Sequence, residues 1–146
     1  MIRVKTAREI AILEEGGAIL AAVLRLVAER VAPGVKTGAL NAYAEKLLEE
    51  RGVRGSFKGY RTSSSREPYP AALCTSVNEE IVHGIPGDRV LSEGDIVTLD
   101  IGVEHKGRYT DAALTVPVGA VSQELRTRIE TARTALARGV SAARAG

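Results

Sequence analysis

Two aspartates, Asp100 and Asp111, stand in neighbouring runs of β-type sequence that are joined by a short polar turn. A hairpin can aim two carboxylates at one point in space, and carboxylate oxygens bind Mn, Fe, Co, Zn or Mg ions. Two carboxylates on one half-buried sheet face repel each other, and a divalent cation between them removes that conflict. Two carboxylates are too few to complete the coordination of a metal ion, so further ligands are needed. On spacing alone, the alternative has equal weight: Asp111 caps a turn and Asp100 is merely solvated.

The first aspartate can be placed by the alternation of the strand that carries it. Residues 95–104 predict a β-strand because apolar and polar residues alternate along them. The apolar side chains that share one face are Val97, Leu99, Ile101 and Val103. Asp100 therefore points to the opposite face.

The second aspartate follows a predicted hairpin turn. Residues 106–107 are Lys-Gly, a suitable two-residue turn, and residues 108–118 form the return strand. This turn puts Gly102 opposite Asp111, so that Asp111 lies diagonal to Asp100 on the same sheet face. A register shift of two residues would put the aspartates directly opposite each other, whereas a shift of one would send them to opposite faces.

Two helices are predicted ahead of the strands. The first begins after Thr6, which forms a capping box with Glu9, and ends before the Pro-Gly pair at 33–34. The second spans residues 38–51, with Thr37 as its N-cap. Apolar residues recur at helical spacing along both, so each helix is expected to be amphipathic.

A third helix is predicted after Ser122, which serves as its N-cap. Its arginines lie on a polar face and are expected to be solvated. The residues expected to face inward recur at helical spacing: Leu125, Ile129, Ala132, Leu136 and Val140.

The middle of the chain reads as short strands. Residues 71–77 and 81–83 are predicted strands, and the Gly-Ile-Pro sequence at 84–86 forces a sharp turn that lets His83 project toward a cleft. A structural role for His83 has equal weight from these residues alone. Cys74 is expected to be a small buried strand residue, because the sequence places no base near it.

The composition limits the class of protein. A chain of 146 residues with 45% hydrophobic content is the size of one globular domain. The net charge of +2 and the scarcity of aromatic residues argue against nucleic-acid binding. No apolar run is long enough to span a membrane. A single cysteine and the lack of a leader sequence favour the cytoplasm.

Three stretches together resemble type I methionine aminopeptidase: residues 69–86 (YPAALCTSVNEEIVHGIP), residues 94–100 (GDIVTLD) and the Thr-Asp pair at 110–111. The likeness extends over essentially the whole chain. It implies an α/β (α+β) fold, namely half of a pita-bread fold, in which helices cover one face of a curved antiparallel sheet. Residues 1–121 would form the first half of that fold, and residues 122–146 a helix that begins the second half.

The resemblance also implies roles for the residues introduced above. Asp100 would bind a metal ion, and Asp111 would bridge two divalent ions, for which Co, Mn, Fe and Zn are candidates. His83 would hydrogen-bond the substrate beside the scissile amide. The implied reaction is the hydrolytic removal of methionine from the N-terminus of peptides by metal-activated water.

The implied methionine pocket is lined by Tyr60, Tyr69 and Cys74. The loop at 61–68, which separates the two tyrosines, is expected to be exposed and is longer than the family's compact version. The family's remaining metal ligands are one histidine and two glutamates, which lie in a second half absent from this sequence. The isolated chain is therefore expected to bind metal weakly and to be inactive or weakly active.

Other interpretations remain open. Two copies of the chain could associate and bring Asp100 and Asp111 of each to one symmetric metal site, or a separate second half could complement the chain. A non-catalytic binding module could use the same fold. A proline-specific aminopeptidase is disfavoured because residues 74–86 resemble the methionine-specific branch.

Overall fold

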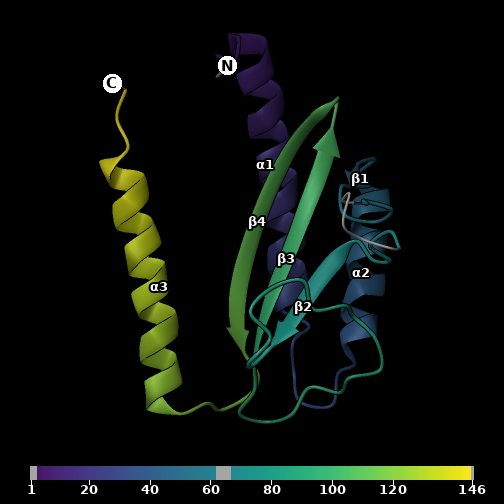
Figure 1. Ribbon diagram of the computed structural model, residues 1–146, viewed down its shortest axis with the longest axis vertical. Helices are drawn as coiled ribbons and strands as arrows, with labels where there is room; N and C mark the ends of the chain where they lie inside the picture. The colour runs from purple at the N-terminus through teal and green to yellow at the C-terminus, as the bar shows by residue number, and fades with distance from the viewer. Residues whose placement is uncertain (1–2, 62–66, 146) are drawn as a thin grey trace.

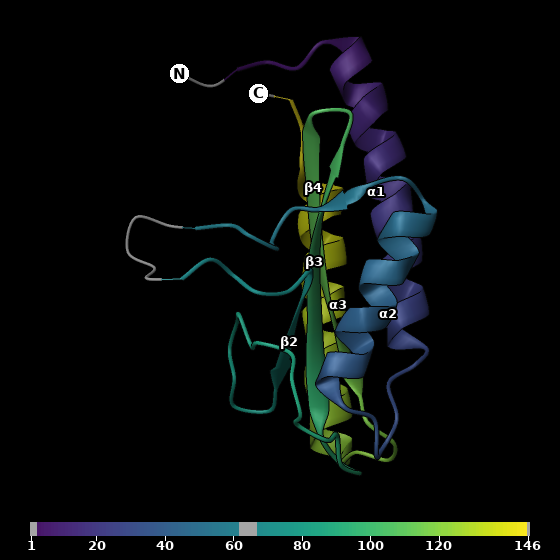
Figure 2. The same ribbon diagram turned by 90° about the vertical axis from the view of Figure 1, so that its right-hand side faces the viewer.

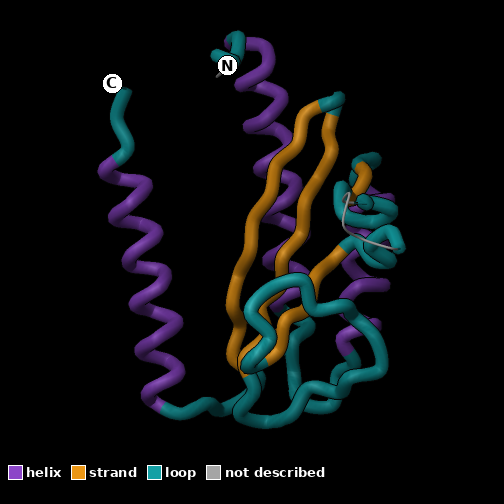
Figure 3. Tube along the Cα trace, in the orientation of Figure 1, coloured by secondary structure: helices purple, strands orange, loops and turns teal. Residues whose placement is uncertain are grey.

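The computed structural model describes residues 3–61 and 67–145 (Figures 1 and 3). Residues 62–66 of the predicted exposed loop therefore lie outside the described residues. The elements are α1 (Ala7–Ala28), α2 (Thr37–Glu50), β1 (Arg54–Gly55), β2 (Leu73–Val77), β3 (Ile96–His105), β4 (Arg108–Pro117) and α3 (Gln123–Ala142). Within these ranges, no helix has both the length and the apolar character that a membrane span requires.

Strand β3 is the centre of an antiparallel sheet. β4 pairs with β3 along one edge, and β1 and β2 pair with different stretches of the other edge. Helices α1 and α2 cover one face of this sheet, as the edge-on view in Figure 2 shows. The described part of the connection before β2 and the segment directly after β2 lie on the other face, whereas residues 87–91 return to the helix side, where Leu91 joins the core and accepts a hydrogen bond from Gly34. The expected arrangement, an antiparallel sheet with helices on one face, is thus confirmed.

The hydrophobic core lies between this sheet and the two helices. The four side chains predicted to share the apolar face of β3 are all fully buried: Val97, Leu99, Ile101 and Val103. They pack in one cluster with buried residues of α1 and α2, among them Leu20, Val23, Val27, Leu40 and Leu47. Each such side chain contributes about 1.5–3 kcal/mol by leaving water. The core therefore fixes the face of β3 that Asp100 must occupy.

The predicted N-cap of α1 is confirmed, and the predicted N-cap of α2 is not. Thr6 caps α1, and both hydrogen bonds of the capping box with Glu9 are present. Thr37 was predicted as the N-cap of α2, which is wrong, because Lys36 is the N-cap and Thr37 is the first helical residue. The hydroxyl of Thr37 instead donates to the carbonyl of Gly87 and accepts from its N–H. A long-range contact has taken the place of the local cap.

The tip of the β3–β4 hairpin is attached to α1 through side chains. Glu15 on α1 accepts hydrogen bonds from Lys106 at 2.6 Å and pairs with His105 at 3.0 Å. Glu9, near the start of the same helix, pairs with Arg108 on β4. The hairpin is thus tied at its turn as well as packed along its length.

Helix α3 stands apart from the sheet, on the side of β4 (Figure 1). Ser122 caps it as predicted. The prediction that its apolar stripe faces inward is wrong within this chain, since no residue of α3 is buried and Leu136 and Val140 are 69% and 68% exposed. Helix α3 is amphipathic by sequence, but no other element of the described chain packs against its apolar stripe.

Candidate metal centre and adjoining cavity

The β3–β4 hairpin brings the two aspartates to one sheet face. Its register pairs Gly102 with Asp111 and Asp100 with Ala113, which is the arrangement predicted from a two-residue turn. Lys106 and Gly107 form that turn with positive φ angles of 49° and 74°, as such hairpins require. The carboxylates of Asp100 and Asp111 are therefore diagonal neighbours on the face opposite the core.

The environment of Asp100 disfavours its negative charge. Its Oδ1 atom is buried and has no hydrogen-bond partner among the described residues. Burial raises the pKa of Asp100, the nearby Asp111 raises it further, and His83 lowers it. Burial also raises the pKa of Asp111. A buried, unpartnered carboxylate oxygen beside a second carboxylate suits a divalent cation, which would neutralise both groups.

The described residues do not complete a metal site. Among the described residues, no group of three or more His, Cys, Asp or Glu side chains is arranged to hold a metal ion. Asp100 and Asp111 could supply two ligands, but Mn, Fe, Co and Zn bind four to six donors. The two carboxylates are the type of ligand that a hard divalent ion prefers, but they are fewer than such an ion needs.

His83 lies in an irregular segment, so the prediction of a strand at residues 81–83 is wrong. Ile81 and Val82 are exposed, and His83 has a φ of +61°. A non-glycine residue in this left-handed region costs on the order of 1 kcal/mol and needs support from its surroundings. The next residue provides it, because the carbonyl of Gly84 accepts from the N–H of Thr75 at 2.8 Å. The segment is held against the edge of β2 without being a strand itself.

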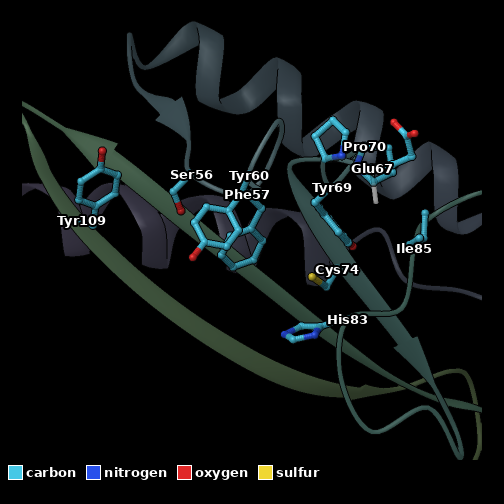
Figure 4. A pocket seen from close by; sticks show the side chains of 11 residues that line it. Ser56, Phe57, Tyr60, Glu67, Tyr69, Pro70, Cys74, His83, Ile85 and Tyr109 are labelled. Atoms are coloured by element: carbon cyan, nitrogen blue, oxygen red, sulfur yellow. The ribbon is translucent and has the colours of Figure 1, made fainter. Parts of the chain in front are cut away.

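A cavity of about 930 Å³ opens beside the aspartates, and aromatic and apolar side chains form most of its lining. The lining residues labelled in Figure 4 are Ser56, Phe57, Tyr60, Glu67, Tyr69, Pro70, Cys74, His83, Ile85 and Tyr109. The structure thus brings together all four side chains predicted to meet the substrate. Asp100 and Asp111 are not lining residues, but Asp100 is the β3 partner of Cys74, and Tyr109 precedes Asp111 by two residues on β4.

Cys74 and Tyr69 are held neutral in this cavity. Cys74 is 2% exposed in β2, as predicted for a small buried strand residue. Burial raises the pKa of its thiol, and the charges of Asp100 and Asp111 add to this effect. Burial likewise raises the pKa of Tyr69 well above its ordinary value. A neutral thiol is a poor nucleophile, so Cys74 suits the wall of a pocket.

Two residues near the aspartates were not singled out from the sequence. A Cβ atom at Gly102 would lie 2.1 Å from Ser56 Oγ and 2.8 Å from the ring of Phe57, so only glycine lets this segment cover the site face of β3. Phe57 also meets Tyr69 edge-on, with ring centroids 6.4 Å apart. The sequence did hold a signal, because a glycine stands on the predicted site face between Asp100 and Asp111.

Comparison with known proteins gives a consistent result. Residues 11–146 match the model of metallopeptidase family M24. The chain is 39% identical to methionine aminopeptidase 1 of Bacillus subtilis and 40% identical to a methionine aminopeptidase of Aquifex aeolicus, over 100% and 99% of its own length. It spans only 56% and 57% of those relatives. A crystal structure of methionine aminopeptidase from Thermotoga maritima superposes on all of the chain with a TM-score of 0.93 at 34% identity, and 57% of that protein is covered.

Proposed function

The chain belongs to metallopeptidase family M24, and from that premise we propose that it is the first half of a methionine aminopeptidase, a hydrolase that removes methionine from the N-terminus of peptides. The observation that carries the proposal is the meeting of two features at one place. Asp100 and Asp111 converge on one sheet face with a buried, unpartnered oxygen. Beside them opens a largely apolar cavity that His83 lines.

In this proposal, Asp100 and Asp111 hold divalent metal. When bound, the metal supplies a Lewis acid and a water of lowered pKa for attack on the peptide carbonyl. His83 faces the scissile amide and donates a hydrogen bond to it. The same hydrogen bond stabilises the negative charge that develops on the reacting group in the transition state.

The cavity receives the methionine side chain. An unbranched thioether packs well against aromatic rings, and its burial needs no hydrogen-bond partner. Tyr69 and Cys74 form the inner wall beside β2, and Tyr60, which is 63% exposed, lies at the mouth. The volume of about 930 Å³ exceeds the needs of one side chain, so the cavity also has room for the adjoining peptide backbone.

The number of ligands sets the expected behaviour of the isolated chain. Two carboxylates bind a divalent ion weakly, and the ion then lacks the donors that would fix its geometry. The proposed domain division assigns residues 1–121 to this half and makes 122–146 the beginning of a second half that supplies the missing donors. Alone, the chain is inactive or nearly so.

Calorimetric titration with Mn²⁺ tests the metal site. Weak binding is expected for the wild type, and Asp100→Asn and Asp111→Asn should abolish it. Asp88→Asn is the matched control, because this side chain is 97% exposed and pairs with Lys36 on the surface. Equal binding by Asp88→Asn and Asp100→Asn would overturn the assignment of Asp100 as a ligand. Efficient hydrolysis of Met-Ala-Ser by a verified monomer would overturn the proposed ligand deficit.

The function itself is tested by completing the protein. The chain is joined to the second half of the Bacillus subtilis relative, and release of methionine from Met-Ala-Ser is measured with and without metal. We expect metal-dependent release that His83→Ala reduces by about a hundredfold to a thousandfold, the typical effect of one lost transition-state hydrogen bond. A folded, metal-loaded chimera without this activity would refute the proposal.

As a second candidate, we propose that two copies of the chain form a symmetric homodimer with one shared metal site. Two exposed features of the chain favour this arrangement. The outer edge of β4 pairs with no other strand in the described chain, and the apolar stripe of α3 is uncovered. A second copy that paired along β4 would cover an exposed edge strand and bring two more aspartates to the site. Light scattering with and without Mn²⁺ tests this state, and a monomer at high concentration in both conditions excludes it.

A further inference from the structure

We propose that Ser76 and Tyr69 are positioning residues, which hold His83 at the cavity by fixing the backbone of Gly84 through its N–H and its carbonyl. This role rests on the proposed function only in making His83 the group that meets the substrate. The positioning itself follows from contacts between side chains and backbone on β2 and in the segment that contains His83.

The backbone of Gly84 is held by three hydrogen bonds, one to its N–H and two to its carbonyl. Its N–H donates to the hydroxyl of Ser76 at 3.0 Å. Its carbonyl accepts from the hydroxyl of Tyr69 at 3.1 Å and from the N–H of Thr75 at 2.8 Å. Two of these three contacts are made by side chains, so they depend on the residue type at positions 69 and 76.

Ser76 is suited to this task by its place on β2. It shares the site face of that strand with Cys74, two residues earlier, and it is only 4% exposed. A buried hydroxyl needs a partner, and the N–H of Gly84 is the partner that Ser76 Oγ has. Loss of the hydroxyl would leave that N–H unpaired, which favours separation of the segment from β2.

Gly84 allows the close approach that these hydrogen bonds need. A Cβ atom there would lie 2.4 Å from the carbonyl oxygen of Thr75 and 2.8 Å from Cα of Ser76. The backbone of the segment thus lies directly on the edge of β2. Side-chain packing adds little, because Ile81, Val82 and Ile85 are mostly exposed.

The strain at His83 shows why the anchor matters. Its left-handed backbone is unfavourable by itself and is joined directly to Gly84. When the backbone of Gly84 is fixed, His83 keeps this conformation and its ring stays beside Cys74 (Figure 4). When the backbone of Gly84 is free, His83 can relax to an ordinary conformation and its ring leaves the cavity.

Tyr69 consequently has two separate functions. Its ring lines the cavity and meets Phe57 edge-on. Its hydroxyl oxygen lies 3.1 Å from the carbonyl oxygen of Gly84, to which it donates, and 3.4 Å from that of Leu73. The phenol proton is therefore engaged by the backbone in holding the segment.

Nuclear magnetic resonance on the full chain tests the proposal. The variants are Ser76→Ala and Tyr69→Phe, with Ser76→Thr as the conservative rescue. Tyr43→Phe is the control for loss of a phenol outside the cavity. The readouts are hydrogen exchange at the amide of Gly84, the φ-sensitive scalar coupling of His83, and the proximity of its ring to Cys74. The chain has two histidines, and His105→Asn assigns their ring signals.

In Ser76→Ala and in Tyr69→Phe we expect exchange at Gly84 to accelerate by about fivefold to tenfold, as for loss of one hydrogen bond. The coupling and ring contacts of His83 should change while those of β3 and β4 stay constant. Ser76→Thr and Tyr43→Phe should match the wild type. If Ser76→Ala does not fold, Tyr69→Phe decides the matter. Unchanged His83 signals in a folded Tyr69→Phe variant would overturn the proposal. None of these measurements requires turnover, so they test the positioning of His83 separately from the hydrolysis of Met-Ala-Ser that tests the proposed function.

Discussion

Replacing glycine by alanine at three positions should have three different effects on the free energy of unfolding. The chemical change is the same, and only the space around the new methyl group differs. A Cβ atom at Gly17 in α1 meets nothing within 4 Å, whereas at Gly102 it meets side chains and at Gly84 it meets backbone. The comparison therefore separates packing from backbone propensity.

The largest cost is expected at Gly84. The carbonyl oxygen of Thr75 would lie 2.4 Å from the new Cβ atom, so the segment must retreat by about 1 Å to reach an ordinary contact. β2 cannot yield easily, because it is paired with β3. The three backbone hydrogen bonds of Gly84 cannot all survive this movement, and at about 1 kcal/mol each their loss costs up to about 3 kcal/mol.

A smaller cost is expected at Gly102 and a gain in stability at Gly17. At Gly102, Ser56 Oγ can rotate away but the ring of Phe57, 2.8 Å from the new Cβ atom, must shift, at about 1–3 kcal/mol. At Gly17, alanine should stabilise the helix by about 0.5–1 kcal/mol.

Urea denaturation followed by circular dichroism gives these free energies, and amide exchange shows where the structure opens. Gly84→Ala should accelerate exchange at residues 83–85 and leave β4 protected. A Gly84→Ala variant whose stability lies within about 0.5 kcal/mol of the wild type, with unchanged exchange at those residues, would refute the reasoning.

Three further predictions concern the carboxylates and the helices. Asp100→Asn should stabilise the metal-free chain near neutral pH, because the pKa of Asp100 is raised and its charged form therefore opposes folding; in thermal melts the gain should vanish as pH falls below the ordinary pKa of 3.8, and a gain that persists there contradicts the assignment. Thr6→Ala removes the hydroxyl that accepts a hydrogen bond from the N–H of Glu9 and should lower the free energy of unfolding by about 1 kcal/mol in urea denaturation. Ser122→Ala removes the cap of α3, which stands apart from the sheet, and should leave the main unfolding transition unchanged. Equal losses of stability in the two variants would contradict this prediction. Leu136→Ser on α3 should change the unfolding free energy of the monomer by less than about 0.5 kcal/mol, because the side chain is 69% exposed; a larger loss would mean that α3 packs on the sheet.

Local chemistry was the part of the fold that the sequence could predict. The capping box of Thr6 and Glu9 involves residues three apart, and the turn at 106–107 fixes the register of the residues beside it. Both depend on contacts between near neighbours. The convergence of Asp100 and Asp111 on one sheet face follows from the same register, so this part of the candidate site could be predicted from the sequence.

Contacts between distant segments account for the errors. Thr37 has the residue type of an N-cap, but its hydroxyl bonds to Gly87, fifty residues away. His83 follows two β-branched residues, which suggested a strand, yet the anchoring of Gly84 on β2 gives it a left-handed backbone. Phe57 was missed because its place over Gly102 depends on how the connection from β1 to β2 crosses the sheet.

The ties between α1 and the hairpin tip bear on how the aspartates meet a cation. Glu15 holds His105 and Lys106, and the core holds the rest of β3, so Asp100 and Asp111 stand on a rigid support in the absence of metal. If they hold a metal ion as proposed, binding it would require little reorganisation of the backbone, because the entropic cost of bringing the two carboxylates together has been met during folding. The affinity of a completed site should accordingly depend on how well the added donors are placed rather than on any adjustment of this hairpin.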